Sequence, residues 1–314
     1  MLRYADAFSC IFASYFYFLN TTLKAHIAVL ATNLFFAINY SLVKYISPSP
    51  IGSYALNLLR VGGSLLLFWT LWLFAKNIVA VHKQDMGRLV LCGLFGVAIN
   101  QMLFIKGLTM TTAIHASLLM LCSPILITIL AFWILKERIT ILKIAGLALG
   151  VIGSAWLIAG KQGAGQPKDY LLGDIFIVLN GISYAIYFIL VKPLMERYTP
   201  LQVVRWVFTF GFIMMLPIGW MQFGEIGWPQ FTVTHTGVLV FVVLAGTFLA
   251  YVFNAYGIRV LGPGITSAYI YIQLVFAVAI AVLFFSEQLT LQKILAGVLI
   301  LGGVYLVSMK KPLR

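Results

Sequence analysis

The stretch Lys136-Glu137-Arg138-Ile139-Thr140 recurs later in the chain as Ser286-Glu287-Gln288-Leu289-Thr290. Both copies continue to the form Glu-x-x-Thr-x-x-Lys, and the second lies 150 residues after the first. The alignment runs without a gap over residues 107–153 and 257–303. Aliphatic identities between apolar segments arise easily by chance, whereas this polar agreement is specific. The sequence therefore contains an internal repeat, and a repeat of this length determines the architecture.

The composition excludes a soluble protein. Hydrophobic residues make up 62% of the 314 residues and charged residues only 9%, whereas soluble domains have about 45–50% and about 25%. The net charge of +13 does not indicate nucleic-acid binding, because the basic residues are spread between apolar runs. Three scattered cysteines, Cys10, Cys92 and Cys122, suggest neither a disulfide framework nor a zinc site. The composition is that of a membrane protein.

Ten apolar stretches are long enough to cross the hydrocarbon core, which takes about 20 residues. The connections between them are short, and many contain Pro, Gly or charge. The sequence predicts an all-α membrane protein with ten transmembrane helices near residues 25–45, 52–74, 88–107, 112–134, 141–159, 172–191, 201–221, 237–257, 264–285 and 290–309.

The distribution of Lys and Arg predicts the orientation. With the N-terminus in the cytoplasm, fifteen basic residues fall on the cytoplasmic side and five on the opposite side. Cytoplasmic loops carry an excess of Lys and Arg. We therefore expect both termini to be cytoplasmic, in the cell membrane of a bacterium, that is, its inner membrane.

The first 24 residues form a separate segment. Residues 7–19 are apolar but too short to span, and no small-residue cleavage site of a signal peptide follows them. An interfacial segment or an over-long start of translation would also explain them. We expect this segment, residues 1–24, to lie outside the fold, and whether the mature protein contains it stays open.

The repeat divides the rest of the chain into two halves of five spans each. A weaker match at an offset of 148 residues aligns Val43-Lys44 with Val191-Lys192. Because five is odd, the second half enters the membrane from the opposite side, so Glu137 is cytoplasmic and Glu287 external. The predicted organisation is a first repeat over 25–160, an external linker over 161–171, an inverted second repeat over 172–310 and a cytoplasmic tail over 311–314. Inverted repeats are typical of secondary transporters, whose sites lie between the repeats near the midplane.

These features resemble the drug/metabolite transporter superfamily, and in particular its EamA-type members. The resemblance rests on the end of each half, on Ser123-Pro124 in the fourth span and on Arg60 in the second, and it covers about residues 25–310. The second copy departs from the pattern with Gln288 in place of Arg and Leu274 in place of Pro. The resemblance implies the ten-helix fold and a transporter, but no particular substrate, since members resemble exporters of amino acids, drugs and varied metabolites.

Polar residues recur on single faces of several predicted spans, and polar groups are costly in lipid. Such residues can join helices by hydrogen bonds, but as a set, drawn from both halves, they favour a lined cavity. We expect amides and phenols to dominate this cavity, with little fixed charge. The predicted substrate-binding residues are Asn33, Tyr40, Arg60, Asn100, Gln101, His115, Ser123, Asn180, Tyr184, Tyr187, Tyr251, Asn254, Tyr269 and Gln273.

Two of these residues allow more than one interpretation. Arg60 lies roughly 12 Å into its span, where it could bind a carboxylate or phosphate, pair with a backbone carbonyl or extend to the surface. His115 is the only predicted intramembrane residue that titrates near neutral pH. It could take part in proton coupling, but a structural role is favoured. Asp174, the acidic residue nearest to a span centre, is expected to begin the sixth helix.

Glu137 and Glu287 each precede a helix, where a carboxylate can cap free amides. Together with Pro124 we assign them structural or gating roles. The dispersed histidines offer no metal site, and no cofactor is expected. An intramembrane enzyme lacks the required dyads or paired aspartates.

We therefore expect a secondary transporter, not an enzyme, that exports small metabolites such as amino acids or related compounds by alternating access. An intramembrane enzyme and a lipid or nucleotide-sugar carrier are the alternatives. The partners are a small molecule and the lipid bilayer, and a monomer is consistent with the sequence. Substrate, direction, coupling ion and oligomeric state stay open.

Overall fold

The computed structural model describes residues 2–73, 80–135, 141–159, 169–261, 266 and 269–308, and for residues 2–20, 124, 128, 131–132, 134–135 and 307–308 it describes the backbone only. The longer elements within these ranges are all helical, as the composition predicts. They are α1 (Leu2–Ile46), α2 (Ser53–Leu73), α3 (Lys83–Gly93), η1 (Leu94–Ala98), α4 (Ile99–Met110), α5 (Ala113–Met120), α6 (Ser123–Leu135), α7 (Ile141–Ala159), α8 (Tyr170–Arg197), α9 (Pro200–Phe223), η2 (Trp228–Gln230), α10 (Val233–Val243), η3 (Leu244–Leu249), α11 (Ala250–Leu261), α13 (Ile270–Phe285) and α14 (Leu291–Ser308).

The helices confirm the ten-span membrane fold. Seven helical runs in the described residues are long and apolar enough to cross a membrane, and three shorter apolar helices lie at Ala113–Ile127, Ile270–Phe285 and Leu291–Leu306. Two of the seven runs combine several elements, since α3, η1 and α4 form one span and α10, η3 and α11 another. The ten helical runs fall on the ten predicted spans.

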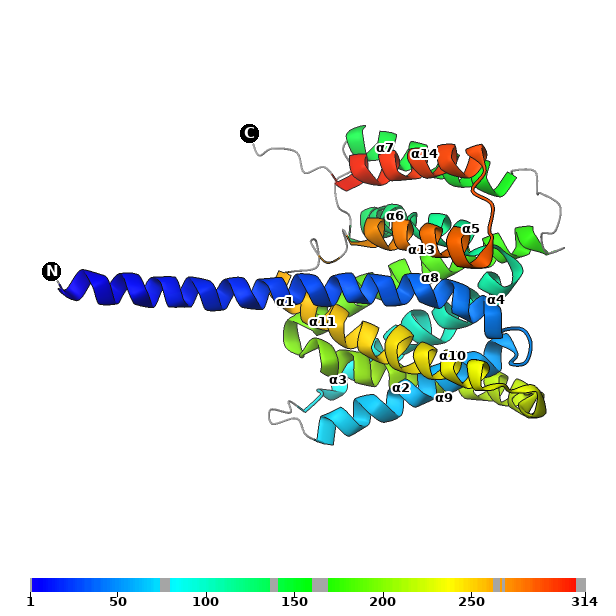
Figure 1. Ribbon diagram of the computed structural model, residues 1–314, viewed down its shortest axis with the longest axis horizontal. Coiled ribbons are helices and arrows are strands. Elements are labelled where there is room, and N and C mark those ends of the chain that lie inside the picture. The colour runs from blue at the N-terminus through cyan, green and yellow to red at the C-terminus, as the bar shows by residue number, and fades with distance from the viewer. Residues whose placement is uncertain are drawn as a thin grey trace.

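Two helices differ in extent from the predicted spans. Helix α1 begins at Leu2 and is continuous with the first span, and its N-terminal part projects beyond the rest of the bundle (Figure 1). Helix α8 continues to Arg197 with Pro193 inside it, although these residues were expected in a loop, because polar and Pro residues can extend a helix beyond the hydrocarbon. The side on which α1 begins is also the side on which α14 ends (Figure 1).

The fourth predicted span is two helices. Helix α5 ends at Met120, the chain turns at Leu121 and Cys122, and α6 begins at Ser123 with Pro124 in its first turn. Pro is favoured in the first turn of a helix, where a missing backbone N–H costs nothing. The residues on both sides of the break are apolar, so hydropathy does not reveal it.

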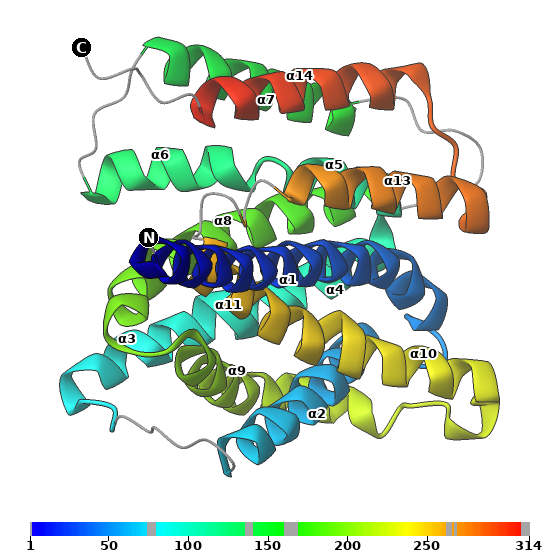
Figure 2. The same cartoon turned by 60° about the vertical axis from the view of Figure 1, so that its left-hand side comes forward.

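The helices of the two halves pack in matching pairs. Helix α4 of the first half packs on α8 of the second, and α1 of the first half packs on α11 of the second. Because α11 is the counterpart of α4 and α1 is the counterpart of α8, the two contacts are equivalent by the repeat. Helix α2 packs on its counterpart α9, and α7 packs on its counterpart α14. Helices α7 and α14 lie together along one edge of the bundle (Figure 2). This exchange is what a two-fold axis in the membrane plane produces.

The third and eighth spans share an irregularity. Each contains a single π-helical stretch, η1 from Leu94 and η3 from Leu244, which begin 150 residues apart as the repeat requires. Each stretch holds a glycine in close contact with the other half: a Cβ on Gly96 would overlap the Tyr187 ring, and one on Gly246 would lie 2.7 Å from Asn39 Oδ1. Because π-helical stretches recur at functional sites, the matching pair directs attention to the region between the halves.

Candidate functional site

A cavity of about 170 Å³ lies between the two halves. Its volume is comparable to that of a cavity that holds a benzene-sized molecule, about 150 Å³. Helices of both halves contribute to the wall, as expected for a site between repeats. The lining residues are Phe36, Asn39, Tyr40, Arg60, Asn100, Gln101, Phe104, Met120, Ser123, Asn180, Tyr184, Tyr251, Ile270 and Gln273.

Nine of the fourteen residues predicted to bind substrate line this one cavity. They come from seven helices, so their proximity is a property of the fold and not of the local sequence. Their role in binding stays a prediction. The nine are Tyr40, Arg60, Asn100, Gln101, Ser123, Asn180, Tyr184, Tyr251 and Gln273.

Arg60 places a positive charge in the cavity wall. The residue is 2% exposed, and its Nε donates to Thr247 Oγ1 at 3.1 Å in the π-helical stretch η3. Its Nη1 is buried without a hydrogen-bond partner among the described atoms. Among the residues whose side chains are described, no carboxylate forms an ion pair with the Arg60 guanidinium. A buried charge is costly unless it is compensated. The fixed charge of the cavity wall, over the residues that the structure describes, is therefore this one guanidinium, in a form suited to an anionic group.

Two asparagines of the cavity wall, Asn39 and Asn180, leave a side-chain acceptor unused. Asn100 and Asn180 bridge α4 and α8, since each side-chain amide nitrogen donates to the other residue's backbone carbonyl, at 3.2 and 2.8 Å. The side-chain nitrogens of Asn100 and Asn180 thus join two helices by hydrogen bonds, which is a common role of amides within the membrane. The buried Oδ1 atoms of Asn180 and Asn39, however, have no partner in the described part of the chain. Such atoms are rare in folded proteins, and both residues line the cavity.

Gln101 and Tyr251 close the wall between the halves. Gln101 Nε2 donates to the Tyr251 hydroxyl at 3.1 Å. The Tyr251 ring packs edge-on against Phe208, with the ring centroids 4.9 Å apart. The phenol is therefore held in place from two sides.

The other predicted residues lie away from the cavity lining. Asn33 Nδ2 donates to the carbonyl of Val29 in its own helix at 2.7 Å. The Tyr269 hydroxyl contacts His26 Nδ1 at 2.7 Å. Tyr187 packs against η1, and the half-buried Asn254 follows Tyr251 by three residues without reaching the lining. Sharing a helix face with a cavity residue was not sufficient to place these side chains at the cavity.

His115 belongs to a separate buried cluster. Its Nδ1 lies 3.2 Å from Asp174 Oδ2, and Thr111 Oγ1 donates to Asp174 Oδ1 at 2.5 Å. Asp174 is fully buried, although the sequence suggested only the start of a helix. The signal that could have revealed it is a lone acidic residue in an otherwise apolar segment.

The repeated Glu-x-x-Thr-x-x-Lys pattern shapes the linker before α14. Thr290 Oγ1 accepts from the Lys293 amide at 3.4 Å, and Lys293 Nζ donates to the carbonyl of Gln288 at 2.7 Å. Glu287 caps a helix, as expected, but the amides belong to α5 of the other half and not to α14. Glu137 lies outside the described residues, and the backbone of Pro124 lies in the first turn of α6.

Five lining residues were missed. Asn39 is a polar residue of the first span, but it lies off the face shared by Asn33 and Tyr40. The other four are apolar, and nothing in the sequence distinguishes them from residues of the core. The five are Phe36, Asn39, Phe104, Met120 and Ile270.

The described side chains contain no group of three or more His, Cys, Asp and Glu that could hold a metal ion. The cavity wall contains one guanidinium, amide and phenol groups, the hydroxyl of Ser123 and apolar side chains. This arrangement can bind a small molecule but contains no nucleophile paired with a base.

The EamA-like transporter family matches the chain twice, over residues 23–159 and 171–309. A "probable terminal-alkyne amino-acid exporter" of Streptantibioticus cattleyicolor is 26% identical over 227 residues, 72% of this chain and 74% of the exporter. The uncharacterized transporter YetK of Bacillus subtilis is 24% identical over 249 residues, 79% of this chain and 76% of YetK. A solved crystal structure at 17% identity has a TM-score of 0.57, covering 91% of this chain and 96% of the other, and shares the fold. Because the two matched ranges fall on the two five-helix halves, the chain belongs to the EamA-like transporter family, within the drug/metabolite transporter superfamily.

Proposed function

We propose that the protein is a secondary transporter that exports small metabolites, such as amino acids or related compounds, by alternating access. The observation that carries this proposal is the cavity between the halves with the uncompensated guanidinium of Arg60 in its wall. Membership of a transporter family and the multi-pass membrane fold support it. The substrate is the small molecule that occupies this cavity, the protein acts in the lipid bilayer, and no nucleic acid or cofactor takes part.

The chemistry of the wall suits an α-amino acid with an apolar side chain. Arg60 can bind the carboxylate by charge-assisted hydrogen bonds. The side-chain amides of Asn39 and Asn180 line the cavity, and their Oδ1 atoms, buried without a partner in the described residues, can accept from the ammonium group once the amides turn toward it. Apolar lining residues such as Phe104 and Met120 can contact the side chain. The name of the relative from Streptantibioticus cattleyicolor, a probable amino-acid exporter, points the same way at 26% identity.

Export from cells tests the proposal. Cells with and without the protein are loaded with labelled apolar amino acids, and the label appearing in the medium is followed over time. We expect faster export with the protein, and export to be lost when Arg60→Gln replaces the native residue at equal expression. Equal export with and without the protein, across a panel that includes drugs and other metabolites, would rule the proposal out.

A further inference from the structure

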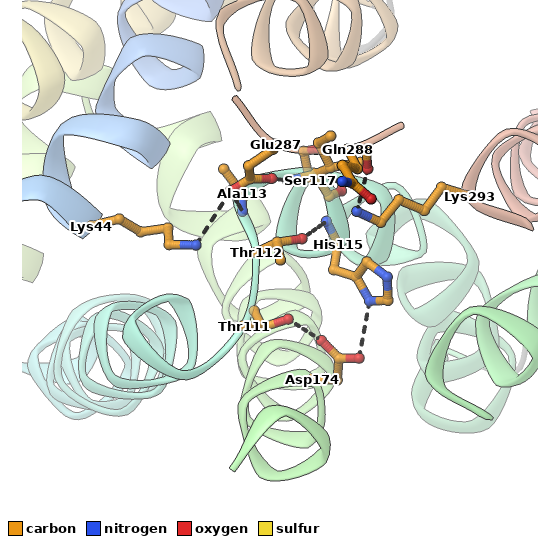
Figure 3. A network of polar contacts seen from close by, with 11 residues as sticks. Lys44, Thr111, Thr112, Ala113, His115, Ser117, Asp174, Glu287, Gln288 and Lys293 are labelled. Atoms are coloured by element: carbon orange, nitrogen blue, oxygen red, sulfur yellow. Dashed lines mark hydrogen bonds and ion pairs between the residues drawn. The ribbon is translucent and has the colours of Figure 1, made fainter. Parts of the chain in front are cut away.

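We infer that Glu287 holds shut the end of the cavity at which α1 finishes and α5 and α8 begin, here called the Lys44 end. The inference rests on the proposed function, because it assigns a gate to the same cavity. It concerns a cluster that lies outside the cavity lining: Lys44, Thr111, Ala113, His115, Asp174 and Glu287 (Figure 3). The backbone amide of Ile114 also belongs to it.

Glu287 is shared between a lysine and a helix end. Its Oε1 accepts from Lys44 Nζ at 3.2 Å and from the Ala113 amide at 2.8 Å, and its Oε2 accepts from the Ile114 amide at 3.0 Å. The carboxylate therefore satisfies two of the free amides that begin α5 and meets the positive end of the helix dipole. The side chain is only 12% exposed, which makes these charge-assisted contacts stronger than contacts at the surface.

A second contact ties the start of α5 to the other half. Thr111 precedes α5 and His115 lies in its first turn, and both contact Asp174 of α8. The carboxylates of Glu287, in the linker before α14, and of Asp174, in α8, thus hold the start of α5 from two different segments (Figure 3).

Every one of these contacts joins the first half to the second. Lys44, Thr111, Ala113, Ile114 and His115 belong to the first repeat, whereas Asp174 and Glu287 belong to the second. Alternating access requires the repeats to move apart at one end of the site. At the Lys44 end they cannot do so without breaking the bonds of these two carboxylates.

The network also lies beyond the cavity on three helices. Lys44 follows the lining residue Tyr40 by four residues, roughly 6 Å along α1 at 1.5 Å per residue. Ala113 precedes Met120 by seven residues, roughly 10 Å, and Asp174 precedes Asn180 by six, roughly 9 Å. On each helix the displacement is toward the Lys44 end, so the network stands between the cavity and this end.

The opposite end has its own contacts between the halves. There Asp85 of α3 pairs with the exposed Arg197 of α8 at 3.0 Å and accepts from the Tyr198 hydroxyl at 2.8 Å. These contacts do not involve Glu287 or the start of α5. Opening of the Lys44 end therefore requires the release of Glu287, whereas the contacts of Asp85 can stay in place.

The rate at which a thiol reagent reaches the cavity reports whether the Lys44 end is open, and this measurement needs no substrate. Cys10, Cys92 and Cys122 are replaced by Ala, Met120→Cys provides a reporter in the cavity wall, and a membrane-impermeant thiol reagent is applied from each side of the membrane. With Glu287→Ala we expect about tenfold faster labelling from the Lys44 end, since two buried amides and an ammonium lose their acceptor. Glu287→Gln, which keeps one acceptor oxygen, should lie between Ala and the native residue.

Two further variants separate the helix cap from the ion pair and from general loss of charge. The exchange of Glu287→Lys with Lys44→Glu restores opposite charges, but a lysine cannot accept from the α5 amides, so labelling should stay fast. Glu225→Gln removes an exposed carboxylate at the same end and should label at the native rate.

The inference would be overturned if both Glu287 variants were labelled at the native rate while gel filtration showed them to be folded. A native labelling rate in the variant with exchanged charges would overturn it as well. Should Glu287→Ala not fold, Glu287→Gln decides. Faster labelling of Glu287→Ala, in a protein that transports no solute, would contradict the proposed function but support the gate. Transport by the native protein, with unchanged labelling of the Glu287 variants, would support the proposed function but contradict the gate.

Discussion

Gln101 and Tyr251 occupy equivalent positions of the two repeats, 150 residues apart, and their side chains are joined by a hydrogen bond of 3.1 Å in the cavity wall. A contact between equivalent residues can form only close to the axis that relates the repeats. The cavity therefore lies near this axis, where secondary transporters with inverted repeats hold their substrates.

Removal of the Tyr251 hydroxyl tests whether this contact serves transport. Tyr251→Phe leaves the Gln101 amide without its acceptor in a buried wall, which costs about 1–3 kcal/mol. We expect transport to fall about fivefold or more at equal expression, measured as export of labelled substrate. Tyr256→Phe, on the same helix but 36% exposed, should leave export unchanged. Equal effects of the two substitutions would show that Tyr251 has no special role.

The contact of α14 with α7 should depend on Gly303 but not on its neighbour. A Cβ on Gly303 would lie 2.6 Å from the Gly146 carbonyl oxygen, whereas one on Gly302 meets nothing within 4 Å. Gly303→Ala must push the helices apart, and overpacking typically costs about 1–3 kcal/mol. The melting temperature of the detergent-solubilised protein should therefore fall for Gly303→Ala and stay within error for Gly302→Ala. Identical melting curves would contradict this packing.

The orientation can be read from two exposed acidic residues at opposite ends of the bundle. Glu225 follows α9, and Glu196 lies in the last turn of α8. With both termini cytoplasmic, Glu225→Cys should react with an impermeant thiol reagent in intact cells, and Glu196→Cys only after the cells are opened. The reverse pattern would show that the basic-residue rule gave the wrong orientation.

The N-terminal segment should be dispensable for transport. Helix α1 is continuous from Leu2, but its first part projects beyond the bundle (Figure 1). A chain that begins at Leu23 keeps the whole first span and should insert and export at the native level. Loss of membrane insertion, measured by fractionation and blotting, would show that residues 1–22 contribute to the fold.

Much of this architecture could be predicted because lipid imposes strict rules on sequence. Length and hydropathy identify spans, and the polar repeat at Glu137 and Glu287 identifies the two halves. The break between α5 and α6 was missed because both sides of it are apolar. Phe104 and Met120 were missed for the same reason, since an apolar residue at a cavity resembles one in the core.

The polar contacts were harder to predict than the helices. The sequence identified Glu287 as a helix cap, but only the packing of the halves shows that it caps α5. Asp174 and His115 are 59 residues apart, and their contact depends on how α5 and α8 pack. Such pairings follow from the tertiary arrangement, which no local pattern encodes.

Flux through proteoliposomes tests the central claim, that solute crosses through the cavity between the repeats, most directly. Purified protein is reconstituted at equal density as native chain, Arg60→Lys and Arg60→Gln, and uptake of a labelled apolar α-amino acid is followed against its concentration. The account predicts saturable uptake by the native protein, a weaker response with Arg60→Lys, and a loss of about tenfold or more with Arg60→Gln, because a charge-assisted hydrogen bond contributes about 1.5–3 kcal/mol. Uptake that is equal in the three proteins, or equal to that of protein-free liposomes, would contradict it.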